Sequence, residues 1–313
     1  MKFAFVFPGQ GSQSVGMLGG FEGNAAVDAV LAKASEALGQ DMRALIAHGP
    51  AEALNLTVNT QPAMLLAGYA CYAAWHQAGG PQAAFMAGHS LGEYTALTAA
   101  GALRLEDALA LVRFRAEAMQ DAVPVGMGAM AAILGLSDAD VRAACEQAAG
   151  SEVVEPVNFN APSQVVIAGH RAAVERACAA AKERGAKRAM LLPVSAPFHS
   201  SLLAPAAQRL AQYLESVQIV SPQVPVINNI DVHMESDPAR IRSALARQAA
   251  GPVRWVDTIR AMADAQVTHV IECGPGKVLA GLTRRIAPEL ESVSIYDEAS
   301  VQDALSKLKG SEA

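Results

Sequence analysis

The chain contains 313 residues, of which 52% are hydrophobic and 17% are charged, and its formal net charge at pH 7 is −6. This composition excludes an intrinsically disordered chain, which would have too little apolar surface to offset the entropy of ordering. The acidic balance provides no overall field that favours nucleic acid, so a polyanionic partner would need a local basic patch. The length indicates about two domains, or one large α/β domain with an insertion.

Neither a membrane span nor a secretory signal is expected. The longest uncharged apolar-rich run, at 122–136, is shorter than the ~20 residues that a span needs. The apolar stretch at 3–7 is too short for a signal and ends at Pro8-Gly9. The four cysteines are scattered and form no CxxC pair, which predicts reduced thiols in a cytoplasmic protein.

The first 124 residues are predicted to alternate strands and helices, with a Gly/Ser/Gln loop after the first strand. Aromatic and β-branched runs favour strands, and Ala- and Leu-rich stretches without breakers favour helices. The expected strands are 3–7 and 85–88, and the expected helices are 25–39, 62–78, 91–102 and 105–120.

Residues 125–194 have a different order of expected strands and helices. The expected strands are 129–134, 153–160, 164–169 and 189–194, and the expected helices are 137–149 and 171–184. The order β-α-β-β-α-β is that of a ferredoxin-like unit. We therefore expect a small domain at 125–194, inserted into a large domain formed by 1–124 and 195–313.

The α/β alternation resumes after residue 195. The expected helices are 202–218, 238–250, 253–265 and one after Gly276, and the expected strands are 224–228, 267–273 and 293–296. Such alternation predicts an α/β fold with a mostly parallel sheet and helices on both faces.

The first candidate for chemistry is a G-x-S-x-G pattern from Gly88 to Gly92, with Ser90 at its centre. The glycines allow a strand to turn sharply into a helix, which exposes the serine hydroxyl beside a free backbone amide. The alternative is an ordinary turn in which the serine caps the helix. The short apolar strand before the pattern and the long helix after it favour a nucleophile.

The best candidate for the base that activates this serine is His199, which lies in a Pro-flanked loop between the two predicted domains. His89 adjoins Ser90, but its side chain should point away at such a turn. His269 lies in an apolar strand and is expected to be a core histidine. The remaining histidines, at 48, 76, 170 and 233, are expected at the surface. No acid stands out as a partner for His199, so a Ser-His dyad is as compatible with the sequence as a triad.

Arg115 lies on the predicted helix that follows the serine helix. A buried arginine would present a rigid fork to a carboxylate. From the sequence alone, however, a surface charge paired with a nearby acid is the favoured interpretation.

No nucleotide loop, metal site or cofactor site is predicted. The glycine-containing loop after the first strand has Ser14 where a dinucleotide loop needs glycine and Met17 where a nucleotide-triphosphate loop needs lysine. The loop at 274–276 has Ile271 where the same kind of phosphate loop needs its first glycine. The sequence also lacks the spaced His and Cys ligands of a zinc site.

Several short segments of the sequence, taken together, resemble the malonyl-CoA:acyl carrier protein transacylase family over nearly the whole chain. The matching segments are 5–13 (FVFPGQGSQ), 88–94 (GHSLGEY), Arg115, 158–162 (NFNAP), Phe198-His199 and 274–276 (GPG). The resemblance implies an α/β-hydrolase-like large domain with an inserted ferredoxin-like domain. It also implies transfer of malonyl from malonyl-CoA to the phosphopantetheine thiol of acyl carrier protein through a malonyl-serine ester, for fatty-acid or polyketide synthesis. Coenzyme A thioester is then a substrate and not a cofactor.

The resemblance assigns roles to individual residues. Ser90 matches the nucleophile and His199 the general base, while Arg115 matches the residue that grips the free malonyl carboxylate. The backbone amides of Gln10 and Leu91 match the oxyanion hole.

Four further positions match supporting roles. Gln248 matches the side chain or loop that orients the histidine. Met119 and Asn160 match positions that line the pocket. Phe198 precedes the histidine, and its type is weak evidence on the size of the acyl group.

A basic segment could dock the acidic carrier protein. Residues 171–188 contain six Lys or Arg against two Glu. We expect this face, including Arg184, Lys187 and Arg188, to contact the carrier, together with the basic residues at 277, 284 and 285. A solvated helix face explains the same charges equally well.

Two other functions are compatible with the sequence. A serine thioesterase or esterase of similar fold would share Ser90 and His199 but would not need Arg115. A non-catalytic module that docks carrier protein would use the serine only as a helix cap. The chain is expected to act as a monomer.

Overall fold

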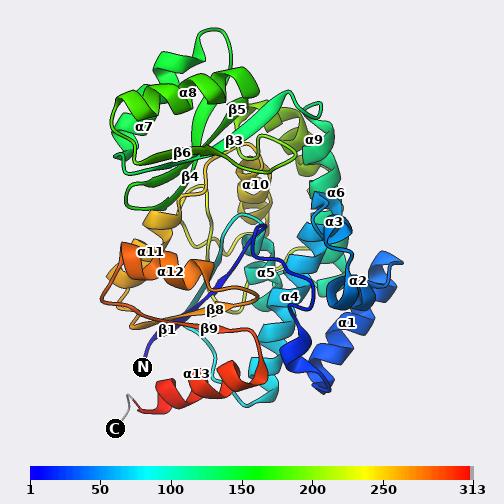
Figure 1. Cartoon of the computed structure of the whole chain (residues 1–313). Helices are drawn as coiled ribbons and strands as arrows, with labels where there is room; N and C mark the ends of the chain where they lie inside the picture. The colour runs from blue at the N-terminus through cyan, green and yellow to red at the C-terminus, as the bar shows by residue number, and fades with distance from the viewer. Residues whose placement is uncertain (311–313) are drawn as a thin grey trace.

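A computed structural model describes residues 1–310 of the chain. Within them, five parallel strands form the larger sheet, in the order β7-β2-β1-β8-β9 (Figure 1). The strands are β1 (Phe3–Phe7), β2 (Phe85–Gly88), β7 (Val226–Ile227), β8 (His269–Cys273) and β9 (Glu291–Ile295). The predicted α/β fold with a mostly parallel sheet is therefore confirmed.

Helices cover both faces of this sheet. One side carries α1 (Ala25–Leu38), α2 (Met42–His48), α3 (Ala51–Leu54), α4 (Thr57–Gln77), α5 (Gly92–Ala99), α6 (Leu105–Asp121), α9 (Ala204–Glu215), α10 (Pro238–Gln248) and α13 (Glu298–Gly310). The other side carries α11 (Trp255–Asp264) and α12 (Val278–Ile286). Short 3-10 turns lie at Gly19–Phe21 and Ser201–Leu203. Within residues 1–310, every helix is too short or too polar to cross a bilayer.

The central strand β1 connects the two cores. Phe3, Phe5 and Phe7 belong to the larger cluster, whereas Ala4 and Val6 belong to the cluster that includes α11 and α12. Successive side chains of a strand point to opposite faces, so a strand covered on both sides is apolar throughout. This accounts for the uninterrupted apolar run at the start of the chain.

A second sheet forms a separate layer at the top of Figure 1. Its described strands are antiparallel and follow the order β4-β5-β3-β6. The elements are β3 (Gly128–Leu134), α7 (Asp138–Ala149), β4 (Val154–Ala161), β5 (Gln164–His170), α8 (Arg171–Glu183) and β6 (Arg188–Leu191). Helices α7 and α8 pack on one face of this sheet around a core of their own.

The edge strand β4 joins the two layers. The backbone N–H of Val253 donates to the carbonyl of Val157 (2.8 Å), and that of Phe159 donates to the carbonyl of Val253 (3.0 Å). The backbone N–H of Ser201 donates to the carboxylate of Glu155 (2.8 Å). Two loops of the large layer, around residues 199 and 250, are thereby held against the small one.

The boundaries of several elements differ from those predicted. Helix α4 begins at Thr57 and not at residue 62, so Pro62 lies inside it. The prediction rested on the Ala- and Leu-rich composition, which begins only after Pro62. Strands β6 and β7 are shorter than expected, because prolines at 193 and 225 cannot donate to a ladder. Helices α2, α3 and α13 were not predicted.

Candidate active site

The turn from β2 into α5 carries Ser90 in a left-handed conformation, with φ of 53°. Both flanking glycines are required by close contacts. A Cβ on Gly88 would lie 1.8 Å from the carbonyl carbon of Gly92, and one on Gly92 would lie 2.0 Å from the carbonyl oxygen of Phe7. The predicted strand–turn–helix context is therefore present, and it holds the serine in a backbone conformation that L residues rarely adopt.

Asn229, which the sequence analysis missed, supports this turn from beneath. Its Oδ1 accepts from the backbone N–H of Ser90 (2.7 Å), and its Nδ2 donates to the carbonyl of Gly88 (2.7 Å). The side chain is fully buried. Strained backbone persists only where neighbours fix it, and Asn229 supplies two such bonds. The sequence signal was weak: an asparagine pair at the end of the predicted strand 224–228.

His199 lies beside the serine hydroxyl. Its Nε2 is 2.7 Å from Oγ of Ser90, and its Nδ1 is 2.9 Å from the carbonyl oxygen of Gln248 and 3.2 Å from that of Gly251. Carbonyls only accept, so the network assigns the proton of the neutral ring to Nδ1 and leaves Nε2 as an acceptor. Within residues 1–310 no carboxylate contacts Nδ1, so the arrangement is a dyad oriented by backbone carbonyls.

The environment keeps this imidazole neutral. Burial, helped by the nearby positive charge of Arg115, lowers the pKa of His199 to about 3, although the two backbone hydrogen bonds act in the opposite direction. A neutral imidazole is the form that can accept the hydroxyl proton.

Arg115 is buried on α6, with 2% of its surface exposed. Its Nη1 donates to Oε1 of Gln61 (2.7 Å), and its Nη2 donates to Oε1 of Gln248 (3.1 Å) and to Oγ of Ser90 (3.2 Å). No ion pair with a carboxylate is found for it in the part of the chain that the structure describes. The interpretation as a surface charge is therefore wrong, because α6 turns this side chain toward Ser90 and into the interior.

Arg113, two residues before Arg115 on α6, points away from Ser90. It donates to the carbonyl of Leu38 (3.1 Å) and to the side chain of Gln40.

The backbone amides of Gln10 and Leu91 lie on the two loops that meet at this turn. Gly9 is packed so closely that a Cβ on it would be 2.5 Å from the carbonyl oxygen of His89. Within residues 1–310, neither amide donates to a protein acceptor. Their assignment to the oxyanion hole stays a prediction.

The other predicted positions vary in their relation to the site. Gln248 supports His199 through its backbone carbonyl, while its side chain bonds to Arg115. Met119 is buried one turn after Arg115 on α6. Phe198 is half-buried and packs against cores of both layers. Asn160 contacts His89, with its Oδ1 2.8 Å from Nε2 of that ring.

Within residues 1–310, neither His89 nor His269 bonds to the hydroxyl of Ser90. The side chain of His89 turns away from the hydroxyl, as expected, and burial lowers its pKa. His269 is a buried residue of β8, with Nδ1 2.9 Å from the Thr268 hydroxyl. Within residues 1–310, His, Cys, Asp and Glu side chains form no group that could hold a metal.

A buried carboxylate lies behind the site. Oε2 of Glu93 accepts from the backbone N–H of Asn229 (2.8 Å) and from Nε2 of Gln248 (2.8 Å). Burial raises the pKa of Glu93 to about 7, although both hydrogen bonds and the charge of Arg115 act in the opposite direction. Glu93 was part of the recognised GHSLGEY string, yet no role was assigned to it.

Comparison with known proteins agrees with this arrangement. Residues 4–302 match the family model described as "Acyl transferase domain". The chain is 53% identical to the malonyl CoA-acyl carrier protein transacylase of Salmonella typhimurium over 98% of this chain and 99% of the relative.

Two solved structures are closely similar. One is the acyl-carrier-protein S-malonyltransferase of Burkholderia pseudomallei, with a TM-score of 0.97, 65% identity and coverage of 98% and 100% of the two chains. The other is a malonyl-transacylase in complex with a type II PKS acyl-carrier protein, with a TM-score of 0.97, 47% identity and the same coverage.

Proposed function

This chain belongs to the acyl transferase domain family, and we propose that it transfers malonyl from malonyl-CoA to the phosphopantetheine thiol of an acyl carrier protein by way of an ester on Ser90. The observation that carries the mechanism is the position of Arg115. A buried guanidinium donates to Oγ of Ser90 and has no carboxylate partner within residues 1–310. A carboxylate on the acyl group would supply the missing counter-charge.

In the first half-reaction, Oγ of Ser90 attacks the thioester carbonyl carbon while Nε2 of His199 takes the hydroxyl proton. The carbonyl oxygen becomes an oxyanion, which accepts from the amides of Gln10 and Leu91; one such donor contributes ~3–4 kcal/mol. The tetrahedral intermediate collapses, the carbon–sulfur bond breaks and coenzyme A leaves with the proton from His199.

The second half-reaction reverses these roles. Nε2 of His199 takes the proton of the phosphopantetheine thiol as its sulfur attacks the malonyl-serine ester. The same two amides hold the oxyanion, and Ser90 leaves as the hydroxyl after regaining the proton from His199. Exchange of one thiol for another in two steps predicts ping-pong kinetics and requires no cofactor.

Arg115 would also select the acyl group. A malonyl carboxylate can pair with the buried guanidinium, whereas an acetyl group would leave that buried cation without a counter-charge. A serine thioesterase would need no such residue, and the named relatives are transacylases, so the alternative is not favoured.

Intact-mass measurement tests the proposal directly. After incubation with malonyl-CoA, the wild-type chain should gain the mass of one malonyl group, and Ser90→Ala should gain none. Adding a phosphopantetheine thiol should then return the protein to its original mass and move malonyl to the thiol. An unmodified wild type would contradict the ester, and release of free malonate would indicate a thioesterase.

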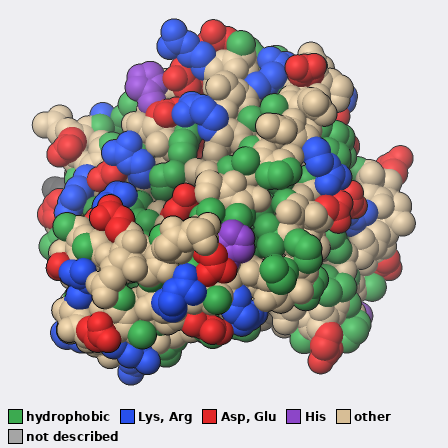
Figure 2. All heavy atoms as spheres, turned by 90° about the horizontal axis from the view of Figure 1, so that it is seen from above, with side chains coloured by type: hydrophobic (Ala, Val, Ile, Leu, Met, Phe, Trp, Pro, Cys, Tyr) green, Lys and Arg blue, Asp and Glu red, His purple; other side chains and the backbone are tan. Residues whose placement is uncertain are grey.

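We further propose that the basic end of the small layer docks the carrier protein. Arg184, Lys187 and Arg188 are exposed where α8 ends and β6 begins. Arg285 of α12 donates to the side chain of Gln164 at the start of β5, and so lies at the same end of the sheet. Figure 2, which looks down on this layer, shows Lys and Arg interspersed with Asp and Glu, so the attraction would be local.

The domain organisation is proposed on the observed order of elements. The β-α-β-β-α-β succession and the sheet order β4-β5-β3-β6 support a ferredoxin-like domain at 125–194, inserted into the large domain. The large domain would be α/β-hydrolase-like. Monomeric state and cytoplasmic location stay predictions.

A further inference from the structure

We propose that Glu93 is a positioning residue, which fixes the nucleophile turn and the substrate-binding arginine together through one carboxylate oxygen, Oε2. The inference rests on the proposed function, because it concerns how Ser90 and Arg115 are held for malonyl transfer. Glu93 is 2% exposed and reaches neither reacting group directly. Its effect must therefore pass through Asn229 and Gln248.

The first connection runs through Asn229 to the serine. Oε2 of Glu93 accepts the backbone N–H of Asn229, which fixes the position of that residue. The side chain of Asn229 then bonds both the N–H of Ser90 and the carbonyl of Gly88. Because the turn is strained at Ser90, small shifts of Asn229 would move Oγ away from the imidazole.

The second connection runs through Gln248 to the arginine. The Nε2 of Gln248 donates to Oε2 of Glu93 (2.8 Å) and to the carbonyl of Ser90 (3.0 Å). With the amide held this way, Oε1 of Gln248 is directed at Nη2 of Arg115. Without an acceptor at residue 93, the amide could rotate and present a donor to the guanidinium, which would release Arg115 from its orientation.

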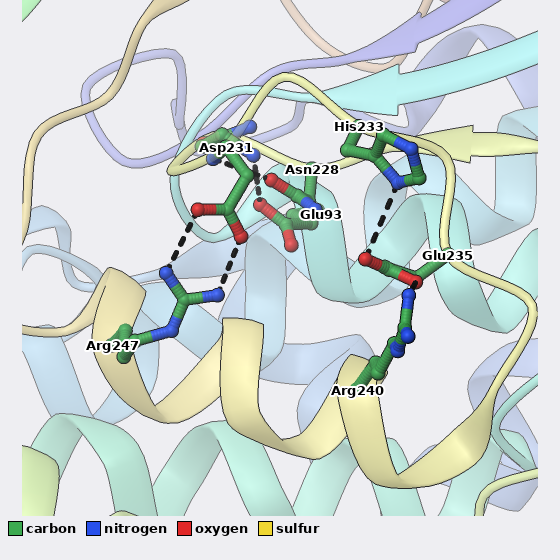
Figure 3. Close-up of polar contacts among 8 residues, drawn as sticks. Glu93, Asn228, Asp231, His233, Glu235, Arg240 and Arg247 are labelled. Carbon is green, nitrogen blue, oxygen red and sulfur yellow. Dashed lines mark hydrogen bonds and ion pairs between the residues drawn. The ribbon is translucent and has the colours of Figure 1, made fainter.

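Glu235 provides a matched control. It lines the same cavity as Glu93 and Asn228. Figure 3 shows its carboxylate turned toward His233 and Arg240, at 3.2 and 3.9 Å. A carboxylate lost from Glu235 therefore alters the cavity without touching the connections to Ser90 and Arg115.

The experiment measures single-turnover acylation of Ser90 by malonyl-CoA and by acetyl-CoA, and the ratio of the two rates. Glu93→Leu removes the acceptor, and Glu93→Asp withdraws it by one methylene while keeping the charge. Both should lower the malonyl-to-acetyl ratio about tenfold. This is the effect expected when the charged Arg115 loses its buried hydrogen bond to Oε1 of Gln248. Glu93→Gln keeps an acceptor oxygen and should stay within about threefold of wild type.

The same substitutions at Glu235, to Leu and to Asp, should leave the ratio unchanged. Circular dichroism and thermal melting establish that each variant is folded; if Glu93→Leu does not fold, Glu93→Asp decides. A wild-type ratio in folded Glu93→Asp overturns the inference, as does a lowered ratio in Glu93→Gln equal to that of Glu93→Asp. Failure of wild type and the Glu235 variants to form the malonyl ester would instead overturn the proposed function.

Discussion

Replacement of Arg115 by alanine should separate malonyl transfer from acetyl transfer. In the free site, Nη1 donates to Gln61 and Nη2 donates to Gln248 and Ser90, while Nε has no partner within residues 1–310. A carboxylate on the acyl group would form a bidentate pair with the planar guanidinium. One of the two bonds would use the Nη2 proton that Oγ held before Ser90 was acylated.

The magnitude follows from these two bonds. A hydrogen bond to a charged group contributes about 1.5–3 kcal/mol, so two contribute about 3–6 kcal/mol. The kcat/KM for malonyl-CoA should therefore fall about 10²- to 10⁴-fold in Arg115→Ala. Acetyl has no carboxylate, and its transfer loses only the contact of Arg115 with Oγ, so its rate should change by less than about tenfold.

The assay follows transfer of labelled malonyl and acetyl groups from coenzyme A to a phosphopantetheine thiol. Arg113→Ala is the matched control, because Arg113 lies on the same helix and bonds to Leu38 and Gln40, away from Ser90. It should leave both rates near those of wild type. Equal losses for the two acyl groups in Arg115→Ala would refute the carboxylate-binding role.

Three further predictions concern the base, the docking face and a helix cap. Because the pKa of His199 is lowered to about 3, its imidazole stays unprotonated at pH 5, so single-turnover acylation should fall less than twofold between pH 7 and pH 5. A base of pKa 6.5 would instead produce a fall of about 25-fold. Because the pKa of Glu93 is raised to about 7, Glu93 also titrates in this range, and the same pH comparison is therefore made in Glu93→Gln. The double substitution Lys187→Glu, Arg188→Glu should raise the KM for carrier protein about five- to tenfold without slowing acylation by malonyl-CoA, and an unchanged KM would exclude this docking face. Ser137→Ala removes the hydroxyl that caps α7 at the N–H of Asp140 and should cost about 1 kcal/mol in urea unfolding; an unchanged midpoint would contradict the role of the cap.

Local features of the sequence were sufficient to predict most helices and strands and to select Ser90 as the nucleophile. The aromatic and β-branched run at 3–7 predicts a strand, and the structure places it between the two cores of the large sheet. Gly88 and Gly92 around Ser90 indicate a sharp strand-to-helix turn, because the backbone there leaves no room for a Cβ. These features depend on neighbours in the chain, so a short window of sequence reveals them.

Only the tertiary structure decided which side chains support the serine. His199 and Gln248 lie 109 and 158 positions from Ser90. No sequence periodicity indicates that residues so far apart come into contact. A surface charge was the favoured interpretation of Arg115 because nothing near it in the sequence indicates burial. It is buried in the fold, where Gln61 of α4 and Gln248 at the end of α10 bond to its guanidinium. Sequence thus determined the local backbone, whereas the burial and pairing of polar groups arose from packing between segments that meet only in the folded chain.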